Sequence, residues 1–274
     1  MQKILILGAS GLVGSALIDE LKNDFDLFGT YSSKLTSLPN DKQFQLEVQQ
    51  LDKLKNITYS IKPDIVISCL RGEFDRQLEF HRELAQDLQN TSTRVYYLST
   101  TNVFDGDFSR SHTEIDIPIA ESDYGNFKIK CENILKKTLD ERVKIIRIPA
   151  IWGKDSSRWN LIKESLKNEK EIDVYSNLVC NNLLDVLLAK QLRFIIEKNL
   201  NGIFHLGSTD LITHGEFFEQ IICKLTNNKN ILRYSLYQDT VDTRYFSLIS
   251  NRNDIPTSFQ CTNQDIISYL LGNG

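Results

Sequence analysis

The sequence predicts an α/β fold in which helices cover both faces of a doubly wound parallel sheet. Over roughly the first 150 residues, short apolar runs alternate with longer amphipathic stretches, the pattern of successive strand–helix–strand units. Several of these runs are nearly continuous, as expected of strands buried on both faces. A glycine-rich turn at residues 8–14 directly follows the first run and precedes an amphipathic stretch.

Six strands are predicted in this N-terminal region: Lys3–Leu7, Asp26–Thr30, Gln43–Val48, Asp64–Cys69, Arg94–Leu98 and Val143–Ile148. Helices fill the intervals between them. In Leu12–Lys22 the apolar residues lie on one stripe, and Tyr124–Thr138 follows two candidate N-caps, Ser122 and Asp123.

Beyond residue 150 the alternation becomes less regular. The pattern predicts helices at Asn160–Asn168, Leu183–Glu197 and Gly215–Leu225 and a strand at Gly202–Leu206, and it leaves residues 251–274 unassigned. We therefore expect a larger part over residues 1–155 and a smaller α/β part over residues 156–274, packed together with chain crossings between them.

Composition excludes several classes of protein. The net charge is -4 and there is no long run of Lys and Arg, which argues against a nucleic-acid partner. The N-terminal apolar run of residues 4–7 is too short for a signal peptide or a membrane span. The five cysteines show no CxxC spacing and the four histidines no HxH or HExxH pattern. We expect a cytoplasmic chain with reduced thiols and no metal.

The glycine-rich turn reads Gly8, Ala9, Ser10, Gly11, Leu12, Val13, Gly14. After a strand and before a helix, the first glycine permits a tight turn, the second allows a pyrophosphate to approach, and the third lets helix and strand pack closely. The helix N-terminus adds free N–H groups for phosphates. The GxxGxxG spacing differs from GxGxxG, but the context predicts a dinucleotide site in a Rossmann fold.

The residues after the second strand indicate which dinucleotide binds. An Asp or Glu about 20 residues beyond the first glycine would hold a ribose 2′-hydroxyl. This chain instead offers Tyr31, Ser32, Ser33 and Lys34, whose hydroxyls and cation suit a 2′-phosphate. We therefore expect NADP(H) to be preferred, with NAD(H) as the other option. The alternative interpretation is a solvated loop without a ligand.

One tyrosine, Tyr124, has a lysine four residues later, at Lys128. On a helix this spacing places both side chains on one face, where the ammonium would lower the pKa of the phenol and prepare it for proton transfer. A third hydroxyl is expected at the end of the fifth strand, where Ser99, Thr100 and Thr101 are the candidates.

These motifs occur in the same order in a known family. The segments GASGLVG, KPDIVI, LSTTNVFDG, TEIDIPIAESDYGNFKIKCE and RIPAIWG resemble extended short-chain dehydrogenases/reductases, in particular the dTDP-4-dehydrorhamnose reductase-like branch of sugar-nucleotide reductases and epimerases. The resemblance implies that Thr100, with Ser99 as the fallback, Tyr124 and Lys128 are catalytic. It also implies an NAD(P)-binding N-terminal part, a substrate-binding C-terminal part, and hydride transfer to a nucleotide-linked 4-keto sugar.

The chain departs from the family after its fourth strand, where Cys69, Leu70 and Arg71 replace a small, Ala-rich loop beside the cofactor. Arg71 is either a ligand for an anion or a solvated loop residue. In the expected substrate region, the candidate contacts are Trp152, Arg158, Trp159 and Asn177, each with packing or surface exposure as its alternative. Asn181 and Asn182 are interpreted as caps of the next helix.

Three functions remain open at this stage. The first is simple reduction, with a nucleotide sugar as the small-molecule partner. The second is epimerase or dehydratase chemistry on the same substrates, for which no additional acid/base residue can be named. The third is a non-catalytic NADP-binding regulatory subunit. A homodimer is compatible with each of them.

Overall fold

The computed structural model of the protein describes residues 1–226 and 231–272. A seven-stranded sheet, with every neighbouring pair parallel, has the order β11-β6-β5-β4-β1-β2-β3. Its members are β1 (Lys3–Leu7), β2 (Asp26–Tyr31), β3 (Gln43–Gln45), β4 (Ile65–Ser68), β5 (Arg94–Thr100), β6 (Val143–Ile148) and β11 (Ile203–His205). The strand order changes direction between β1 and β4, which confirms the doubly wound Rossmann arrangement.

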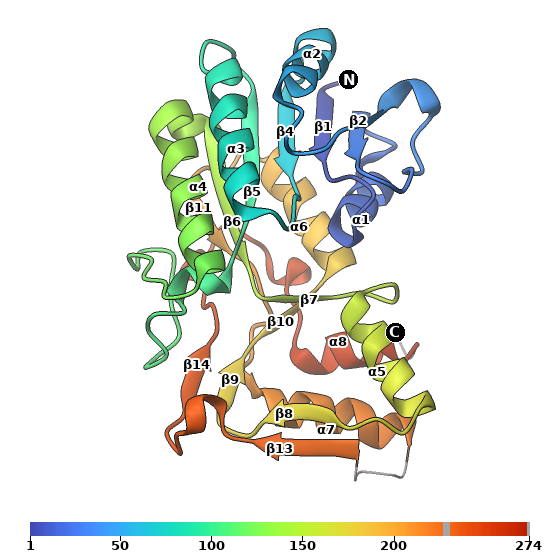
Figure 1. Cartoon of the computed structure of the whole chain (residues 1–274), viewed down its shortest axis with the longest axis vertical. Helices are drawn as coiled ribbons and strands as arrows, with labels where there is room; N and C mark the ends of the chain where they lie inside the picture. The colour runs from blue at the N-terminus through green and yellow to red at the C-terminus, as the bar shows by residue number, and fades with distance from the viewer. Residues whose placement is uncertain (227–230, 273–274) are drawn as a thin grey trace.

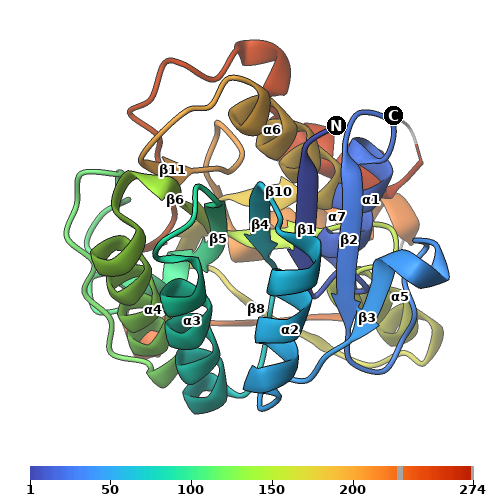
Figure 2. The same ribbon diagram turned by 90° about the horizontal axis from the view of Figure 1, so that it is seen from above.

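Helices cover both faces of this sheet (Figure 2). One face carries α2 (Leu51–Ile61), α3 (Phe74–Leu88) and α4 (Asp123–Leu139), and the other carries α1 (Leu12–Leu21) and α6 (Asp185–Glu197). Along β1, Ile4 and Ile6 belong to the core under α1 and α6, whereas Leu5 and Leu7 belong to the core under α2, α3 and α4. Because successive side chains of a strand point to opposite faces, a continuous apolar run is buried on both sides.

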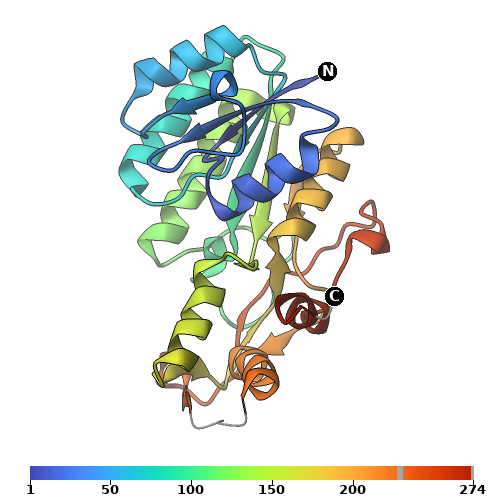
Figure 3. The same cartoon turned by 90° about the vertical axis from the view of Figure 1, so that its right-hand side faces the viewer.

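A smaller C-terminal part lies beyond the carboxyl ends of the strands (Figures 1 and 3). Its helices are α5 (Ser157–Lys167), α7 (His214–Leu225) and α8 (Asn263–Leu270). Its strands are β7 (Ala150–Trp152), β8 (Ile172–Tyr175), β9 (Leu178–Cys180), β10 (Asn182–Leu184), β12 (Ile212–Thr213), β13 (Leu232–Ser235) and β14 (Arg244–Phe246). In residues 1–226 and 231–272, no helix combines the length and apolarity needed to span a bilayer.

The chain returns to the large sheet after residue 156. The strand β11 pairs with β6, and α6 packs against α1. These two elements lie in the second half of the sequence but belong to the seven-stranded sheet and to the helices that cover it. The division of the chain into parts at residue 155 stays a prediction.

Several predicted boundaries are wrong. The third strand ends at Gln45 rather than Val48, because the Glu47 N–H donates to the side chain of Gln50 in a turn. The fifth strand continues to Thr100 through its pairing with β6. Residues 182–184 form β10 against β7 instead of beginning a helix, so Asn181 and Asn182 are not helix caps. The unassigned C-terminal stretch contains α8.

Candidate active site

The glycine-rich turn joins β1 to α1 at the carboxyl edge of the sheet (Figure 1). Gly8 has a φ of +79°, a conformation that favours glycine, and its N–H donates to Thr30 Oγ1 at 3.0 Å. A Cβ on Gly14 would lie 2.4 Å from the Gly8 carbonyl oxygen, whereas one on Gly11 would meet that oxygen only at 3.4 Å. The chain therefore needs Gly8 and Gly14 for its own packing and leaves Gly11 open.

The start of α1 is free to receive an anion. Gly11 is its N-cap, no side chain caps the helix, and no acidic residue lies in its first turn. The first N–H groups of a helix lack intrahelical partners and carry a partial positive charge. Together with the open Gly11, these features fit the pyrophosphate of a dinucleotide.

Two further loops border the glycine-rich turn. Tyr31 ends β2, and Ser32, Ser33 and Lys34 follow it as exposed residues. On the other side, Cys69, Leu70 and Arg71 follow β4, and a Cβ on Gly8 would lie 3.3 Å from the Cys69 carbonyl oxygen. Burial raises the pKa of the Cys69 thiol to about 12. At neutral pH this thiol is therefore uncharged and a poor nucleophile.

Tyr124 and Thr100 meet where β5 ends and α4 begins. The Thr100 side chain caps the 3-10 helix at Thr101–Phe104, and a Cβ on Gly125 would lie 2.2 Å from the Asn102 carbonyl oxygen. Only a glycine after the tyrosine allows this approach of α4, which brings Tyr124 near enough to Thr100 for that hydroxyl to influence the pKa of the phenol. The sequence prediction overlooked Gly125, although its place directly after Tyr124 was a usable signal.

The start of α4 is held by a second set of contacts. Of the two candidate N-caps, Ser122 caps the helix: it accepts a hydrogen bond from the Gly125 N–H at 3.0 Å and donates a short one to Asp105. The same carboxylate accepts the N–H groups of Glu121 and Ser122 at 2.7 and 3.1 Å. Asp105 thus positions the helix that carries Tyr124, a role the sequence prediction missed.

The other hydroxyls of this strand end point elsewhere. Ser99 donates to Glu132 Oε1 at 2.6 Å, farther along α4 than Tyr124, and Glu132 pairs with the buried Arg147, Nη2 to Oε2, at 2.7 Å. Thr101 is buried and bonds to the Ile148 carbonyl oxygen at 3.4 Å. Of the three candidates, Thr100 is the hydroxyl that the structure places beside Tyr124.

The pKa of Tyr124 is raised, against the prediction. Burial is the dominant cause, while the Arg71 charge and the hydrogen bond to Thr100 oppose it. The ammonium of Lys128 lies 5.9 Å from the Tyr124 ring, but it donates to the Leu98 carbonyl oxygen at 2.9 Å. Because Lys128 is itself buried, its own pKa falls to about 8.

The predicted substrate contacts divide into two groups. Trp152 and Trp159 are buried, and Trp152 donates from Nε1 to Asn182 Oδ1 at 2.8 Å. Asn177 is buried and donates from Nδ2 to three backbone carbonyl groups of the C-terminal part. These three residues pack the fold. Arg158, in the first turn of α5, is exposed.

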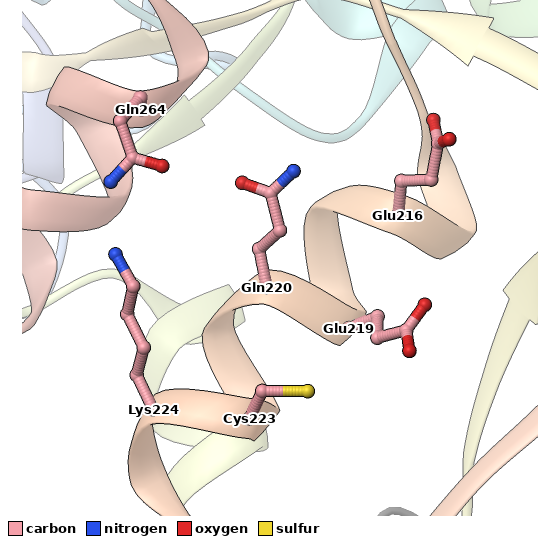
Figure 4. Close-up of a pocket in the computed structure, with 6 residues that line it drawn as sticks. All are labelled: Glu216, Glu219, Gln220, Cys223, Lys224 and Gln264. Carbon is pink, nitrogen blue, oxygen red and sulfur yellow. The ribbon is translucent and has the colours of Figure 1, made fainter.

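Neither of two other features provides a competing site. A shallow hollow on α7 and α8 is lined by Glu216, Glu219, Gln220, Cys223, Lys224 and Gln264, none of which is a predicted site residue (Figure 4). In the part of the chain that the structure describes, no group of three or more His, Cys, Asp or Glu side chains could hold a metal ion. Each of the five cysteines is a free thiol.

The sequence of this chain is similar to those of known proteins. Residues 1–240 match the model of the RmlD substrate binding domain family. Methionine adenosyltransferase 2 subunit beta of Danio rerio is 23% identical over 245 residues, which cover 78% of this chain and 71% of that protein.

Two solved structures have the same fold. The dTDP-4-dehydrorhamnose reductase of Clostridium acetobutylicum has a TM-score of 0.81 at 20% identity and covers 99% of both chains. The reductase of the same name from Bacillus anthracis, in complex with NADP, has a TM-score of 0.81 at 19% identity and covers 100% of both. Together with the family match, the fold and the order of the motifs show that the chain belongs to the RmlD substrate binding domain family, an extended short-chain dehydrogenase/reductase branch.

Proposed function

We propose that this protein is an NADPH-dependent reductase that converts the keto group of a nucleotide-linked 4-keto sugar to an alcohol. The observation that carries the proposal is the proximity of Thr100 and Tyr124 at the carboxyl edge of the sheet. The glycine-rich turn lies at the same edge, two strands away, because β5, β4 and β1 are neighbours. Ligands of doubly wound sheets bind at this edge, where the strand order reverses.

The residues that would hold the dinucleotide come from three loops. The turn at residues 8–14 would take the pyrophosphate, Tyr31 to Lys34 the adenosine ribose and its 2′-phosphate, and Cys69 to Arg71 the wall of the site. A bound reduced nicotinamide supplies the hydride that the carbonyl carbon must receive. The lack of a carboxylate at residues 31–37 and the cation of Lys34 favour NADPH.

Tyr124 supplies the proton in this proposal. Its raised pKa keeps the phenol protonated at neutral pH, which is the state needed to donate a proton to the oxygen of a carbonyl that accepts hydride. Thr100 is placed to hydrogen-bond the same oxygen and to stabilise its developing charge. Lys128, a buried cation beneath them, favours the tyrosinate that remains after transfer.

The substrate class is supported by the comparisons. The two solved structures described above are both named dTDP-4-dehydrorhamnose reductases. A nucleotide-linked 4-keto sugar provides a carbonyl that the Tyr124 and Thr100 hydroxyls could activate together. The C-terminal part, which includes Arg158 in the first turn of α5, would bind the nucleotide end.

The test is to supply the protein with NADPH and a panel of 4-keto nucleotide sugars and to measure their reduction as the loss of NADPH absorbance. We expect Tyr124→Phe to lower kcat by about 10²- to 10⁴-fold, the usual contribution of a general acid, with little change in the Kd of NADPH. Tyr59→Phe is the matched control, because that tyrosine is 77% exposed on α2. Full activity of the Tyr124 variant, or no reduction of any sugar by the unaltered protein, would refute the proposal.

A second candidate is a nicotinamide-binding regulatory subunit. Its support is the similarity to methionine adenosyltransferase 2 subunit beta, a protein named as a subunit of another enzyme. Such a subunit would bind NADPH and yet leave every keto sugar of the panel unreduced. Turnover with one of the sugars would therefore exclude this candidate as the sole function.

A further inference from the structure

A buried ion pair, the Glu132–Arg147 pair, joins α4 to the large sheet. Arg147 on β6 donates from Nε to Glu132 Oε1 at 3.0 Å and from Nη2 to Glu132 Oε2 at 2.7 Å. Its third nitrogen, Nη1, lies 3.3 Å from Nε2 of His205 on β11. Glu132 is 1% exposed and Arg147 is 0% exposed. Because the two hydrogen bonds of the pair have a defined geometry, the carboxylate is held in one orientation.

The Glu132–Arg147 pair contacts the chain on both sides of Thr100. On one side, Ser99 donates from Oγ to Glu132 Oε1 at 2.6 Å. On the other side, the Arg147 guanidinium lies 5.1 Å from the centre of the Phe104 ring, and Phe104 ends the 3-10 helix that Thr100 caps. Ser99 and Arg147 are also partners in the pairing of β5 with β6. The segment that carries Thr100 is therefore attached to the pair at two points.

The pair also belongs to the helix that carries Tyr124. Glu132 lies about two turns after Tyr124 on α4 and one turn after Lys128. Lys128 donates to the Leu98 carbonyl oxygen at 2.9 Å, and Glu132 accepts from Ser99, the next residue of β5. Two successive turns of α4 are thus bonded to two successive residues of the strand. These contacts determine where α4, and with it Tyr124, lies along β5.

Contacts within the strand end orient the Thr100 hydroxyl but do not place it relative to α4. The hydroxyl accepts the Asn102 N–H at 3.3 Å and donates to Asn102 Oδ1 at 3.1 Å. Both bonds lie within three residues, so they leave the position of the whole turn undetermined. That position depends on contacts from outside the turn, which are the approach of Gly125 to Asn102 and the Glu132–Arg147 pair.

A buried ion pair adds little net stability, because the desolvation of both charges offsets their attraction. Its hydrogen bonds are directional, however, and they fix the groups that they join. We propose that Glu132 and Arg147 are positioning residues, which hold Thr100 and Tyr124 at the spacing that both hydroxyls need to reach one carbonyl oxygen. This assignment rests on the proposed reduction of a keto sugar. A misplacement of about 1 Å at such a site can lower the rate by about 100-fold.

Ser99→Ala tests the link to β5 and leaves the Glu132–Arg147 pair intact. We expect kcat to fall by about tenfold or more, while the Kd of NADPH and the KM of the sugar stay within about twofold. With NADPH deuterated at the transferred hydride, the isotope effect on kcat should rise, because hydride transfer becomes slower relative to product release. Thr93→Val is the matched control with unchanged kcat, since it removes a buried hydroxyl directly before β5 that donates to the Pro63 carbonyl oxygen at 2.7 Å.

The double variant Glu132→Leu/Arg147→Met separates positioning from stability. Apolar side chains of similar size can replace a buried pair without loss of folding. We therefore expect a Tm close to that of the unaltered protein and a kcat lower by about tenfold or more. Arg193→Met is the control, because Arg193 of α6 forms ion pairs with Glu20 and Glu197 on the face of the sheet opposite α4 (Figure 2). If the double variant does not fold, Ser99→Ala decides alone.

A titration of Tyr124 tests the same positioning without turnover. The hydrogen bond from Thr100 lowers the pKa of Tyr124, so displacement of Thr100 should raise this pKa. In ¹³C NMR of protein labelled at the tyrosine Cζ, with Tyr124→Phe assigning the resonance, Ser99→Ala should titrate at a higher pH than the unaltered protein. Thr100→Val should have at least the same effect, and the two substitutions together should add nothing further.

The outcomes for the two proposals are distinct. If the unaltered protein reduces a keto sugar, normal kcat of Ser99→Ala, or of a folded double variant, refutes the positioning role and leaves the reductase standing. If it reduces none, the reductase is contradicted and the titration decides. A raised titration in Ser99→Ala then supports the positioning role, and an unchanged one refutes it.

Discussion

Lys128 lies one helical turn after Tyr124 on α4 and is almost completely buried. Its side chain is 3% exposed, and its ammonium has the Leu98 carbonyl oxygen and the face of the Tyr97 ring as neighbours. Burial of a cation among such partners disfavours the charged form, which is why its pKa falls to about 8. Holding the charged ammonium at this buried position therefore lowers the free energy of unfolding.

This cost predicts a pH-dependent difference in stability. Below pH 8 the folded and unfolded states both carry the proton, and the penalty is largest; between pH 8 and 10.5 only the unfolded state keeps it, so the penalty fades. Lys128→Met removes this penalty, so the variant should be more stable than the unaltered protein below pH 8. The difference between their free energies of unfolding should shrink by about 3 kcal/mol between pH 8 and 10.5. Urea unfolding checks it, with exposed Lys130→Met as control; a constant difference would contradict the lowered pKa.

Lys34 is the residue on which the cofactor preference depends. It is exposed in the loop after β2, and no acidic side chain accompanies it there. We expect Lys34→Ala to weaken NADPH binding by about tenfold while leaving NADH binding within twofold, since only NADPH carries the 2′-phosphate. Calorimetry with both cofactors measures this. Lys62→Ala, at the amino end of β4, is the control, and equal losses for the two cofactors would remove the preference.

At the scale of elements, the glycines of the turn from β1 to α1 differ in how much space surrounds them. A Cβ on Gly14 would lie 2.6 Å from Ala9 Cα as well as 2.4 Å from the Gly8 oxygen, and backbone atoms cannot move aside cheaply. A Cβ on Gly11 would meet only one atom within 4 Å. Gly11 and Gly14 therefore lie in the same turn, but only Gly14 is required for the packing of the turn itself.

Two alanine variants test this division. We expect Gly14→Ala to lower the unfolding free energy by roughly 2–4 kcal/mol through overpacking. Gly11→Ala should leave the Tm nearly unchanged and weaken NADPH binding by at least about tenfold, because its methyl group occupies the approach of the pyrophosphate. Thermal unfolding of both variants measures their stability, and titration calorimetry measures their affinity for NADPH. Normal NADPH affinity of Gly11→Ala would argue against a dinucleotide at this turn.

At the scale of the whole molecule, the buried His81 and His205 and the half-buried His214 connect elements that are distant in the chain. His81 bonds to Ser68 Oγ at 2.8 Å between α3 and β4, and His205 on β11 lies 3.3 Å from Arg147 on β6. His214 accepts the Tyr175 N–H at 3.3 Å. Burial lowers the pKa of His81 to about 3 and the pKa values of His205 and His214 to about 4.

These pKa values predict sensitivity to mild acid. Each histidine binds a proton in the unfolded state below about pH 6.5, but in the folded state only at about pH 4, or about pH 3 for His81, so stability falls as the pH drops through this window. Near pH 5 the three together predict a slope of about 4 kcal/mol per pH unit. Urea unfolding at several pH values measures the slope. His81→Gln should reduce it by about one third, and an unchanged slope would contradict a neutral buried imidazole.

The residue pattern alone was sufficient for the features that depend on local geometry. The glycine-rich turn, with its positive φ and close approaches, is determined within residues 8–14, and the one-turn spacing of Tyr124 and Lys128 follows from helix periodicity. The apolar runs predicted the parallel strands for the same reason, because burial on both faces leaves a signal in consecutive residues.

Only the tertiary structure decided which groups act on one another. The packing of α4 on β5 gives Ser99 the Glu132 carboxylate as its partner and leaves Thr100 beside Tyr124, and burial reverses the expected shift in the pKa of Tyr124. Folding also returns β11, from the second half of the chain, to the large parallel sheet. Desolvation and long-range contacts depend on neighbours that are distant in the chain, so spacing along the sequence carries no record of them.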